Sequence, residues 1–553
     1  MSHHEHGHPP AWKEWLFTTD HKKIGILYLI TAFVFFLLGG LAALAIRWQL
    51  MWPTDPADAA TALINPELFN QLFSMHGTTM IFLWIIPVAA GFGNYFVPLL
   101  IKARDMSFPR LNALSYWTYL AAGIVIYWGL FYPSAGAFAL GNGGWTGYPP
   151  LSERPFSPGP GIDYWALGIQ LVGVSSMMGA INFIVTTFRE RGPGVTLNNM
   201  SLFVWSVLVT AVLVTFATPS IGSALVMLLF DRNLGTNFFW NPGCEPGIAS
   251  YACLADPILY QHLFWFYSHP AVYVMILPPM GIVSWIIPRF TGRPIFGYKA
   301  MAYSMAAIGL IGFTVWMHHM FATGTSLLLR TGFMIMTMII AVPSGVKVFN
   351  WLASIWHAKI QFTTPMLWSL GFVAMFTIGG VDGVFLASIP VDYHLHMTYW
   401  VVAHIHYVLF GGAVMGVFAG FYFWLPRMTG RMYNEKLGQW HFWLTLISLN
   451  IVFFTMHWVG YEGMPRRVYS YDAPFTLGNQ LASLGAFILG AAQLLFIWNL
   501  VWMARHGPIV TKDPWGEKPT NEWLTYVPPK KAPAPGVAAS GVLEVVPGGG
   551  QVK

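Results

Sequence analysis

The chain has 553 residues, and only 9% of them are Asp, Glu, Lys or Arg, whereas soluble domains carry about 25%. Hydrophobic residues make up 56%, aromatic residues 16%, and the mean hydropathy is +0.55. This composition excludes a water-soluble globular protein and a disordered chain. The formal net charge of +6 comes without any stretch dense in Lys and Arg, which excludes nucleic acid as a partner. The sequence therefore indicates an all-α integral membrane protein.

A membrane-crossing helix needs about 20 consecutive, mostly apolar residues. The chain contains twelve such runs, which predict twelve transmembrane helices in one bundle: 24–46, 71–100, 114–138, 163–187, 200–230, 258–288, 300–321, 333–357, 366–388, 398–425, 440–461 and 481–505. The polar segment before the first run does not have the pattern of a cleavable signal peptide.

Basic residues set the orientation, because they accumulate in cytoplasmic loops. With the N-terminus in the cytoplasm, 21 Lys and Arg residues fall on inner segments, and six fall on outer ones: Arg47, Arg154, Arg232, Arg330, Arg466 and Arg467. Lys347 lies within a span. We therefore expect a multi-pass protein of a bacterial inner (plasma) membrane, with a cytoplasmic N-terminal tail (1–23), a twelve-helix core (24–505) and a flexible cytoplasmic tail rich in Pro, Gly and Ala (506–553).

Ionisable side chains at membrane depth are costly and mark functional sites by default. Counted at about 1.5 Å per residue, six histidines in four spans share one depth, in the outer half of the bilayer: His76, His269, His318, His319, His404 and His406. Isolated histidines that bond between helices would not give this pattern. That plain interpretation does hold for five others: His262, His357, His441, His457 and His506.

The spacing of the six histidines indicates how they bind metal. His404 and His406 are about 200° apart around a helix, so they face opposite sides, cannot bind one metal together and can serve two cofactors. His318 and His319 are adjacent, and both reach one ion only where a helix end presents its edge to it, with His269 as a third nitrogen. Three neutral imidazoles with open positions suit copper.

Ten ordered motifs resemble subunit I of the haem-copper oxidases, over about residues 15–525. They are MHGTTMIF (75–82), GFGNYFVPLL (91–100), DMSFPRLNALSYW (105–117), GWTGYPPLS (144–152), SSMMGAINF (175–183), HPAVYVMILP (269–278), WMHHMF (316–321), AVPSGVKVF (341–349), VVAHIHYV (401–408) and GMPRR (463–467). The resemblance implies two haems and a copper ion, CuB. Its ligand assignment is His76 and His406 for the low-spin haem, His404 for the high-spin haem, and His269, His318 and His319 for CuB.

The resemblance also gives roles to residues around these histidines. Tyr273 lies one helical turn after His269, and in the family this tyrosine is linked covalently to that histidine and donates an electron and a proton when the dioxygen bond breaks. Arg466 and Arg467, with Trp145, match the residues that hold the haem propionates, which paired guanidiniums bind well.

Arg47 resembles the arginine that contacts the formyl group of the low-spin haem. This match favours haem A. Snorkelling of the side chain to the membrane interface is the alternative.

Two proton pathways follow from the same resemblance. Lys347 is about 21 Å deep in the eighth span and, with Ser344 and Thr337, matches the family's lysine pathway. The second pathway is expected to begin at Asp105 and to continue through five polar residues: Asn94, Asn112, Ser175, Ser176 and Asn182.

The second pathway departs from the family pattern at its end. The usual glutamate is Ala271, and no Asp or Glu occurs in the sixth span. Tyr267 is one turn before Ala271 on the same face, and Ser268 follows it. An A-type branch of the family closes the path with such a Tyr-Ser pair, so we expect proton pumping to be retained, with Tyr267 as the relay.

The outer edge carries further candidates. His396 matches a magnesium ligand of the family, although its usual Asp neighbour is Met397, a poor ligand for a hard cation. Asp382 and Asp392 lie on the exit side, where they either assist proton release or pair near the propionates.

Cys244 and Cys253 are the only cysteines and share one outer loop. An oxidising compartment on that side would permit a disulfide between them.

The resemblance implies the catalytic subunit of a respiratory terminal oxidase, which reduces dioxygen to water and moves protons. Electrons would come from cytochrome c through a copper centre in subunit II, and subunit III is a further expected partner. Subunit I of a quinol oxidase is the alternative. A nitric oxide reductase fits Tyr273 and Lys347 less well, and a transporter without cofactors does not account for six histidines at one depth.

Overall fold

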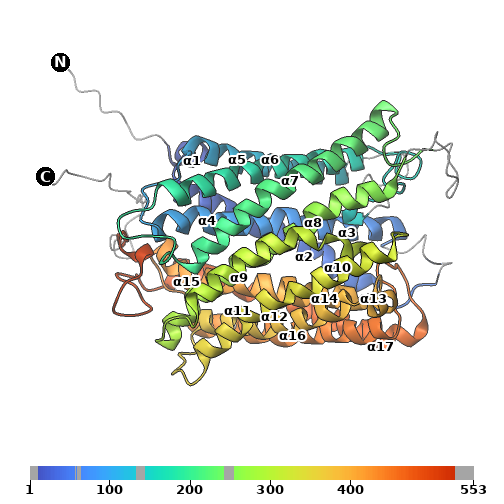
Figure 1. Cartoon of the computed structure of the whole chain (residues 1–553). Helices are drawn as coiled ribbons and strands as arrows, with labels where there is room; N and C mark the ends of the chain where they lie inside the picture. Colours follow the sequence, from blue (N-terminus) through green and yellow to red (C-terminus); the bar gives the residue numbers. More distant parts are fainter. Residues whose placement is uncertain (1–9, 56–57, 59–63, 132–143, 242–254, 530–553) are drawn as a thin grey trace, which may run out of the picture.

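The computed structural model describes residues 10–55, 58, 64–131, 144–241 and 255–529. Within these residues, eleven helical stretches are long and apolar enough to cross a membrane, and Figure 1 shows them as one bundle. The stretches are α2 (His21–Gln49), α3 to α4 (Pro66–Leu100), α5 (Pro109–Phe131), α6 (Gly161–Arg189), α7 (Leu202–Leu234), α8 (Pro257–Thr291), α10 to α11 (Leu327–Ile355), α12 (Thr364–Ala387), α14 to α15 (Tyr399–Thr429), α16 (Glu435–Tyr461) and α17 (Thr476–His506). The all-helical membrane fold is confirmed.

The predicted run 300–321 differs from a regular spanning helix. It forms α9 (Tyr298–Ile311), followed by two short 3₁₀ turns at Gly312–Thr314 and Trp316–Met320, and α9 packs against α7, α8 and α11. The α-helix is thus interrupted just before His318 and His319. This break provides the helix edge that two adjacent histidines need to reach one ion.

Three stretches form the centre of the bundle. The most apolar windows of α3 to α4, α8 and α14 to α15 are each 83% buried, whereas that of α2 is 33% buried. The central stretches carry His76, His269 and the pair His404 and His406. The outer helices turn their apolar sides to the membrane and shield this centre from it.

Polar residues fix the helix ends. Asp20 accepts hydrogen bonds from two backbone N–H groups at the start of α2, and Asn65 does so from Leu68 at the start of α3. Side chains of this kind satisfy the N–H groups that a first helical turn leaves free. α8 and α15 end at Gly292 and Gly430, whose φ angles of 66° and 69° favour glycine.

Both described ends of the chain lie at the same end of the bundle. The short helix α1 (Ala11–Leu16) and residues 507–529 are at the left of Figure 1. We call this end the terminal face and the opposite end the far face. The eleven stretches and the α9 segment together make an even number of membrane crossings. An even number returns the chain to the face from which it started.

Residues 507–529, part of the predicted flexible tail, pack on the terminal face. Arg289 donates to Asp513 over 2.6 Å, and Arg427 Nε donates to the carbonyl oxygen of Glu522 over 2.7 Å. The Glu522 side chain is fully buried and accepts a hydrogen bond from the Trp285 indole at 3.0 Å. These anchors belong to pairs far apart in sequence, so composition alone gives no sign of them.

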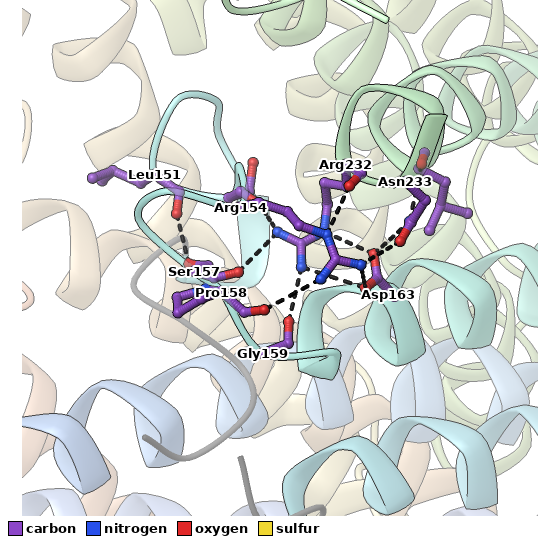
Figure 2. A network of polar contacts seen from close by, with 10 residues as sticks. Leu151, Arg154, Ser157, Pro158, Gly159, Asp163, Arg232 and Asn233 are labelled. Atoms are coloured by element: carbon purple, nitrogen blue, oxygen red, sulfur yellow. Dashed lines mark hydrogen bonds and ion pairs between the residues drawn. The ribbon is translucent and has the colours of Figure 1, made fainter. Parts of the chain in front are cut away.

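A buried ion pair clamps the loop before α6 at the far face, as Figure 2 shows. Arg232 Nε donates to Asp163 over 2.7 Å, and its other nitrogens donate to the carbonyl oxygens of Ser152, Ser157 and Gly159. Arg154 adds hydrogen bonds to the Arg232 carbonyl (2.7 Å) and to Asn233. The clamp fixes the loop that carries Trp145.

Arg232→Met should lower the free energy of unfolding by about 3–5 kcal/mol, because Asp163 and three carbonyl oxygens lose a buried partner. Arg154→Met is the matched control, since the Arg154 side chain is 48% exposed and should cost about 0–1 kcal/mol. Thermal unfolding in detergent measures both. Equal losses of Tm would contradict this account.

Candidate functional site

Three histidines from two segments meet between α8 and the 3₁₀ turn after α9. The ligating nitrogens of His269, His318 and His319 all lie within 4.8 Å of one another. His269 Nδ1 is 3.1 Å from His319 Nε2. Two nitrogens at this separation, each about 2.0 Å from one ion, would subtend about 100° at it, close to a tetrahedral angle. These residues fit a three-imidazole metal centre.

Neighbouring side chains orient two of the three imidazoles. The Thr337 hydroxyl donates to the Phe333 carbonyl at 2.6 Å, so its oxygen accepts from His318 Nδ1 at 3.1 Å. A proton on Nδ1 leaves the lone pair of the His318 ring on Nε2, for a metal. Trp265 stacks on His319 with ring centroids 3.8 Å apart. Thr337, expected only in the lysine pathway, therefore supports the cluster as well.

Tyr273 lies beside this cluster. Its ring centroid is 4.7 Å from that of His269, with the planes at 68°. Gly312 makes room for it, because an added Cβ would come within 2.9 Å of the tyrosine ring. The phenol is thus held against His269 by packing from the segment that carries the other two histidines.

His76 and His406 form a parallel pair. Their ring centroids are 6.1 Å apart with an angle of 7° between the planes. Nδ1 of His76 bonds to the Gly39 carbonyl at 2.9 Å, and Nδ1 of His406 bonds to the Val402 carbonyl at 2.8 Å. A carbonyl only accepts, so both Nε2 atoms keep their lone pairs. The separation fits one metal ion between two nitrogens at about 2.0 Å each.

Each of these two histidines precedes a π-helical stretch. Thr79–Ile85 follows α3, and Tyr407–Val414 follows α14. π-helical turns are rare and frequently occur at functional sites. The hydrophobic pattern of the two spans contains no sign of them, so the sequence did not predict this feature.

His404 points to a different partner from its neighbour His406. Its Nδ1 lies 3.3 Å from Oδ2 of Asp382 on α12. Gly383 lets the helix approach the ring, because a Cβ there would be 3.0 Å from His404 Cε1. The two histidines of α14 thus have separate surroundings, as the spacing predicts.

Arg47 is buried rather than extended to the interface. It is 5% exposed and bonds to Ser483 and to both oxygens of Asn479 on α17. Its third nitrogen, NH1, is buried without a hydrogen-bond partner. This orphaned donor fits a carbonyl-bearing ligand, and the burial disagrees with the snorkelling alternative.

Arg466 and Arg467 form a cationic pair in the loop after α16. Burial and the adjacent Arg467 lower the pKa of Arg466 to about 10. Both Nε atoms are buried without hydrogen-bond partners, and among the described residues neither guanidinium has a carboxylate within 4.0 Å. Such a pair fits anionic groups supplied from outside the chain.

Trp145 packs on α3 close to His76. A Cβ on Gly77 would come within 2.9 Å of the Trp145 ring, so glycine is needed there. The next aromatic residue of the loop, Tyr148, accepts a hydrogen bond from Trp265, which itself stacks on His319. The loop held by the Arg232 clamp therefore reaches both groups of histidines.

Lys347 is 0% exposed on α11, and its Nζ has no hydrogen-bond partner. The ammonium group lies 5.3 Å from the centroid of the Trp351 ring. Ser344, one turn earlier, donates only to the Ile340 carbonyl. An unpaired buried lysine is costly, which is typical of a proton-transfer group rather than of a stabilising residue.

The second predicted path borders a partly open cavity of about 70 Å³, enough for several water molecules. Three of the predicted residues, Asn94, Ser175 and Ser176, line it. Tyr28 lines it too and lies within 3.4 Å of Ser175 and 3.0 Å of Ser115. Sequence reasoning missed Tyr28 and Ser115, because α2 and α5 give no sign of where they meet.

The other residues of this path lie toward the terminal face. Burial raises the pKa of Asp105, in the loop after α4, to about 6. The amide of Asn112 is buried without hydrogen-bond partners, whereas Asn182 bonds twice to the backbone of Phe108. Asn182 thus shapes the chain around the path.

Tyr267 lies on the same face of α8 as two residues that line the cavity, two and three turns before them. Val274 and Pro278 line the cavity and share one helix face with Tyr267 and Ala271, at intervals of four, three and four residues. Tyr267 is 8% exposed and stacks against Phe82, with ring centroids 6.3 Å apart. The Ser268 hydroxyl is buried without a hydrogen-bond partner.

The candidate residues predicted at the outer edge have different surroundings from one another. His396 belongs to no group of three closely spaced metal ligands among the described residues. Met397 holds Arg466 through its carbonyl oxygen (2.8 Å) and its sulfur (3.3 Å). Burial raises the pKa of Asp392 to about 7. Cys244 and Cys253 lie outside the described residues.

Three of the five histidines given a plain interpretation have hydrogen-bond partners. His262 bonds to Trp316, His441 to Tyr422 and Gln493, and His457 to Asp382. These contacts agree with their assignment as polar residues between helices.

Comparisons with known proteins agree with this geometry. Residues 23–488 match the family described as Cytochrome C and Quinol oxidase polypeptide I. Cytochrome c oxidase subunit 1 of Thermostichus vulcanus is 47% identical over 94% of this chain and 91% of its own length. Cytochrome c oxidase polypeptide 1 of Halobacterium salinarum is 45% identical over 97% of this chain and 88% of its own.

The fold is also similar to that of a solved structure. A chain from a cryo-electron microscopy structure of a heme-copper terminal oxidase dimer superposes with a TM-score of 0.73. The match covers 90% of this chain and 86% of that one at 18% sequence identity. At this identity the likeness shows the fold alone.

Thr337→Val should weaken copper binding by about 10–100-fold, because His318 loses the acceptor that fixes its ring. Thr377→Val is the matched control, since the Thr377 hydroxyl bonds only to the Val373 carbonyl of its own helix. Competition of copper-depleted protein with a chelator measures the affinity. Equal affinities of the two variants would contradict a supporting role for Thr337.

Proposed function

This chain belongs to the haem-copper oxidase subunit I family, and from this premise we propose that it is the catalytic subunit of a respiratory terminal oxidase. It reduces dioxygen to water with electrons from cytochrome c and couples the reaction to proton translocation. The observation that carries the proposal is the division of six histidines at one depth into a parallel pair, a trio and a single residue. The names of the 45–47% identical relatives favour cytochrome c as the donor.

The cofactors proposed are two haems and CuB. His76 and His406 would hold the low-spin haem, His404 the high-spin haem, and the trio the copper. Haem A is favoured because the orphaned NH1 of Arg47 suits a formyl oxygen. When bound, these groups supply electron transfer and the site of dioxygen reduction.

The protein's own residues position and protect these groups. Arg466, Arg467 and Trp145 would hold the haem propionates. Tyr273, packed on His269, would provide a proton and an electron from its phenol. The apolar walls of α8 and α14 to α15 exclude bulk water, so protons must arrive along defined paths.

Two paths would lead protons from the terminal face. The path through Lys347, Ser344 and Thr337 would supply protons to the side of the histidine cluster where Tyr273 lies. Asp105, with a pKa raised to about 6, exchanges protons close to neutral pH at the start of the other path.

The cavity above Asp105 joins the second path to Tyr267. Asn94, Ser175 and Ser176 line it, and Asn112 and Asn182 would belong to the part of the path between Asp105 and the cavity. Tyr267 and Ser268 would replace the family's glutamate at the end of this path, which places the chain in the A-type branch.

The membrane arrangement completes the proposal. The terminal face is cytoplasmic, in a bacterial inner membrane, and 1–23 and 506–553 are cytoplasmic segments around the 24–505 core. Subunits II and III would complete the complex, with the electron-accepting copper centre in subunit II. On the far face, Asp392, with a pKa raised to about 7, would assist proton release. A magnesium ion at His396 remains a prediction.

A reduced-minus-oxidised optical spectrum of the purified protein tests the proposal. Haem A bands with dioxygen consumption driven by reduced cytochrome c are expected. Haem O or B bands with activity on quinol would instead favour a quinol oxidase, which the family description includes. The absence of any haem would contradict both functions.

Tyr267→Phe should abolish proton translocation in reconstituted vesicles, because it removes the phenolic hydroxyl proposed to relay protons in place of the glutamate. Tyr303→Phe is the control, since Tyr303 is 63% exposed on the membrane side of α9. Proton release per electron, measured with a pH indicator during dioxygen reduction, reports the effect. An unchanged ratio in Tyr267→Phe would eliminate the relay.

A further inference from the structure

Asp382 is a buried carboxylate whose described ion pairs involve only histidines. It lies near the end of α12 and is 5% exposed. No Lys or Arg of the described residues lies within 4.0 Å of it; its partners at that distance are His404 and His457. A buried charge without a cationic partner is expensive, so its surroundings point to a role.

Two imidazole nitrogens converge on one oxygen of this carboxylate. His457 Nε2 is 2.9 Å from Asp382 Oδ2, and His404 Nδ1 is 3.3 Å from the same oxygen. His457 approaches from α16, which brings three helices together at this point. Only the His457 contact is a hydrogen bond; His404 Nδ1 is buried without a hydrogen-bond partner, so its contact with the carboxylate is electrostatic.

The close approach of α12 to the His404 ring is built into the backbone. The residue after Asp382 is Gly383, and a Cβ there would meet His404 Cε1 at 3.0 Å. A larger residue would push the ring away and lengthen the contact to Asp382. The glycine and the aspartate thus act together to set the distance between helix and ring.

His404 differs from His76, His406 and His318 in the group nearest its Nδ1, which is the carboxylate of Asp382. His76 and His406 bond to backbone carbonyls, and His318 bonds to a threonine hydroxyl. These acceptors are neutral. A carboxylate accepts a stronger hydrogen bond and makes the ligating nitrogen more basic, as in carboxylate–histidine–metal arrangements.

We propose that Asp382 is a positioning residue that tunes the iron bound by His404, with His457 as a competing donor that moderates its effect. This inference rests on the proposed role of His404 as a haem ligand. The negative carboxylate 3.3 Å from His404 Nδ1 raises the electron density on Nε2, which stabilises the ferric over the ferrous state. The low-spin haem, bound by His76 and His406, has no such carboxylate and is not tuned in this way.

Substitutions of Asp382 and of His457 should shift the midpoint potential of the high-spin haem in opposite directions. Asp382→Asn removes the negative acceptor, so the midpoint potential of the high-spin haem should rise and the iron–histidine stretching frequency should fall. His457→Phe removes the competing donor and leaves more of the carboxylate to His404, so both quantities should move the other way. A purely structural role for Asp382 gives no reason for opposite signs.

The experiment is a potentiometric titration of both haems, with resonance Raman spectra of the ferrous high-spin haem, on the purified complex. For Asp382→Asn we expect about a tenfold change in the ferrous-to-ferric ratio at fixed potential, equal to about 59 mV for one electron. The low-spin haem should not shift, and Asp382→Glu should restore part of the difference.

Intact haems with an unchanged potential in Asp382→Asn, or shifts of the same sign in Asp382→Asn and His457→Phe, would overturn the inference and leave the proposed oxidase function standing. Should Asp382→Asn bind no high-spin haem, the direction of the shift in His457→Phe decides. A wild-type complex without haem would instead overturn the proposed function.

Discussion

The central histidines of this bundle depend on the acceptors around them. A neutral imidazole has one N–H and one lone pair, and only the nitrogen without a proton binds metal. The Nδ1 atoms of His76, His406 and His318 are held by Gly39, Val402 and Thr337. Each of these contacts chooses the tautomer and leaves Nε2 available. The packing of the helices therefore decides which nitrogen of each imidazole is free to bind metal, because a neutral imidazole alone has two tautomers.

The same centre holds charged groups that the chain itself does not neutralise. Arg47 is buried with an orphaned NH1, the Nε atoms of Arg466 and Arg467 are buried without partners, and Lys347 has no hydrogen-bond partner. Unpaired buried polar atoms cost stability, so a bundle selected only to fold would replace them. Haem side chains for the arginines and transferred protons for the lysine account for all four residues within one proposed function.

Much of this could be predicted from the sequence, because hydropathy and helix spacing act over short distances. The spans, the common depth of the six histidines and the opposite faces of His404 and His406 follow from a rise of about 1.5 Å and a turn of about 100° per residue. The His318 and His319 pair also required a helix edge, and the 3₁₀ turn at Trp316–Met320 supplies it.

The other features of the fold and the site depend on contacts between distant segments. The spacing of residues along one helix does not reveal such contacts. Tyr28 reaches Ser115, Glu522 reaches Trp285, and Asp382 meets His457 across long sequence separations. The hydrophobic pattern likewise contains no sign of the π-helical turns after His76 and His406. The sequence predicted Asp382 at a proton exit or near the propionates, and it gave no sign that His404 and His457 are its neighbours.

Anomalous diffraction from crystals of the intact complex, measured at the iron and copper absorption edges, would show which histidines of this chain bind metal. We expect one iron between His76 and His406, a second iron at Nε2 of His404, and one copper among His269, His318 and His319. Metal at other residues of this chain, or copper absent from the trio in a fully active preparation, would contradict this expectation.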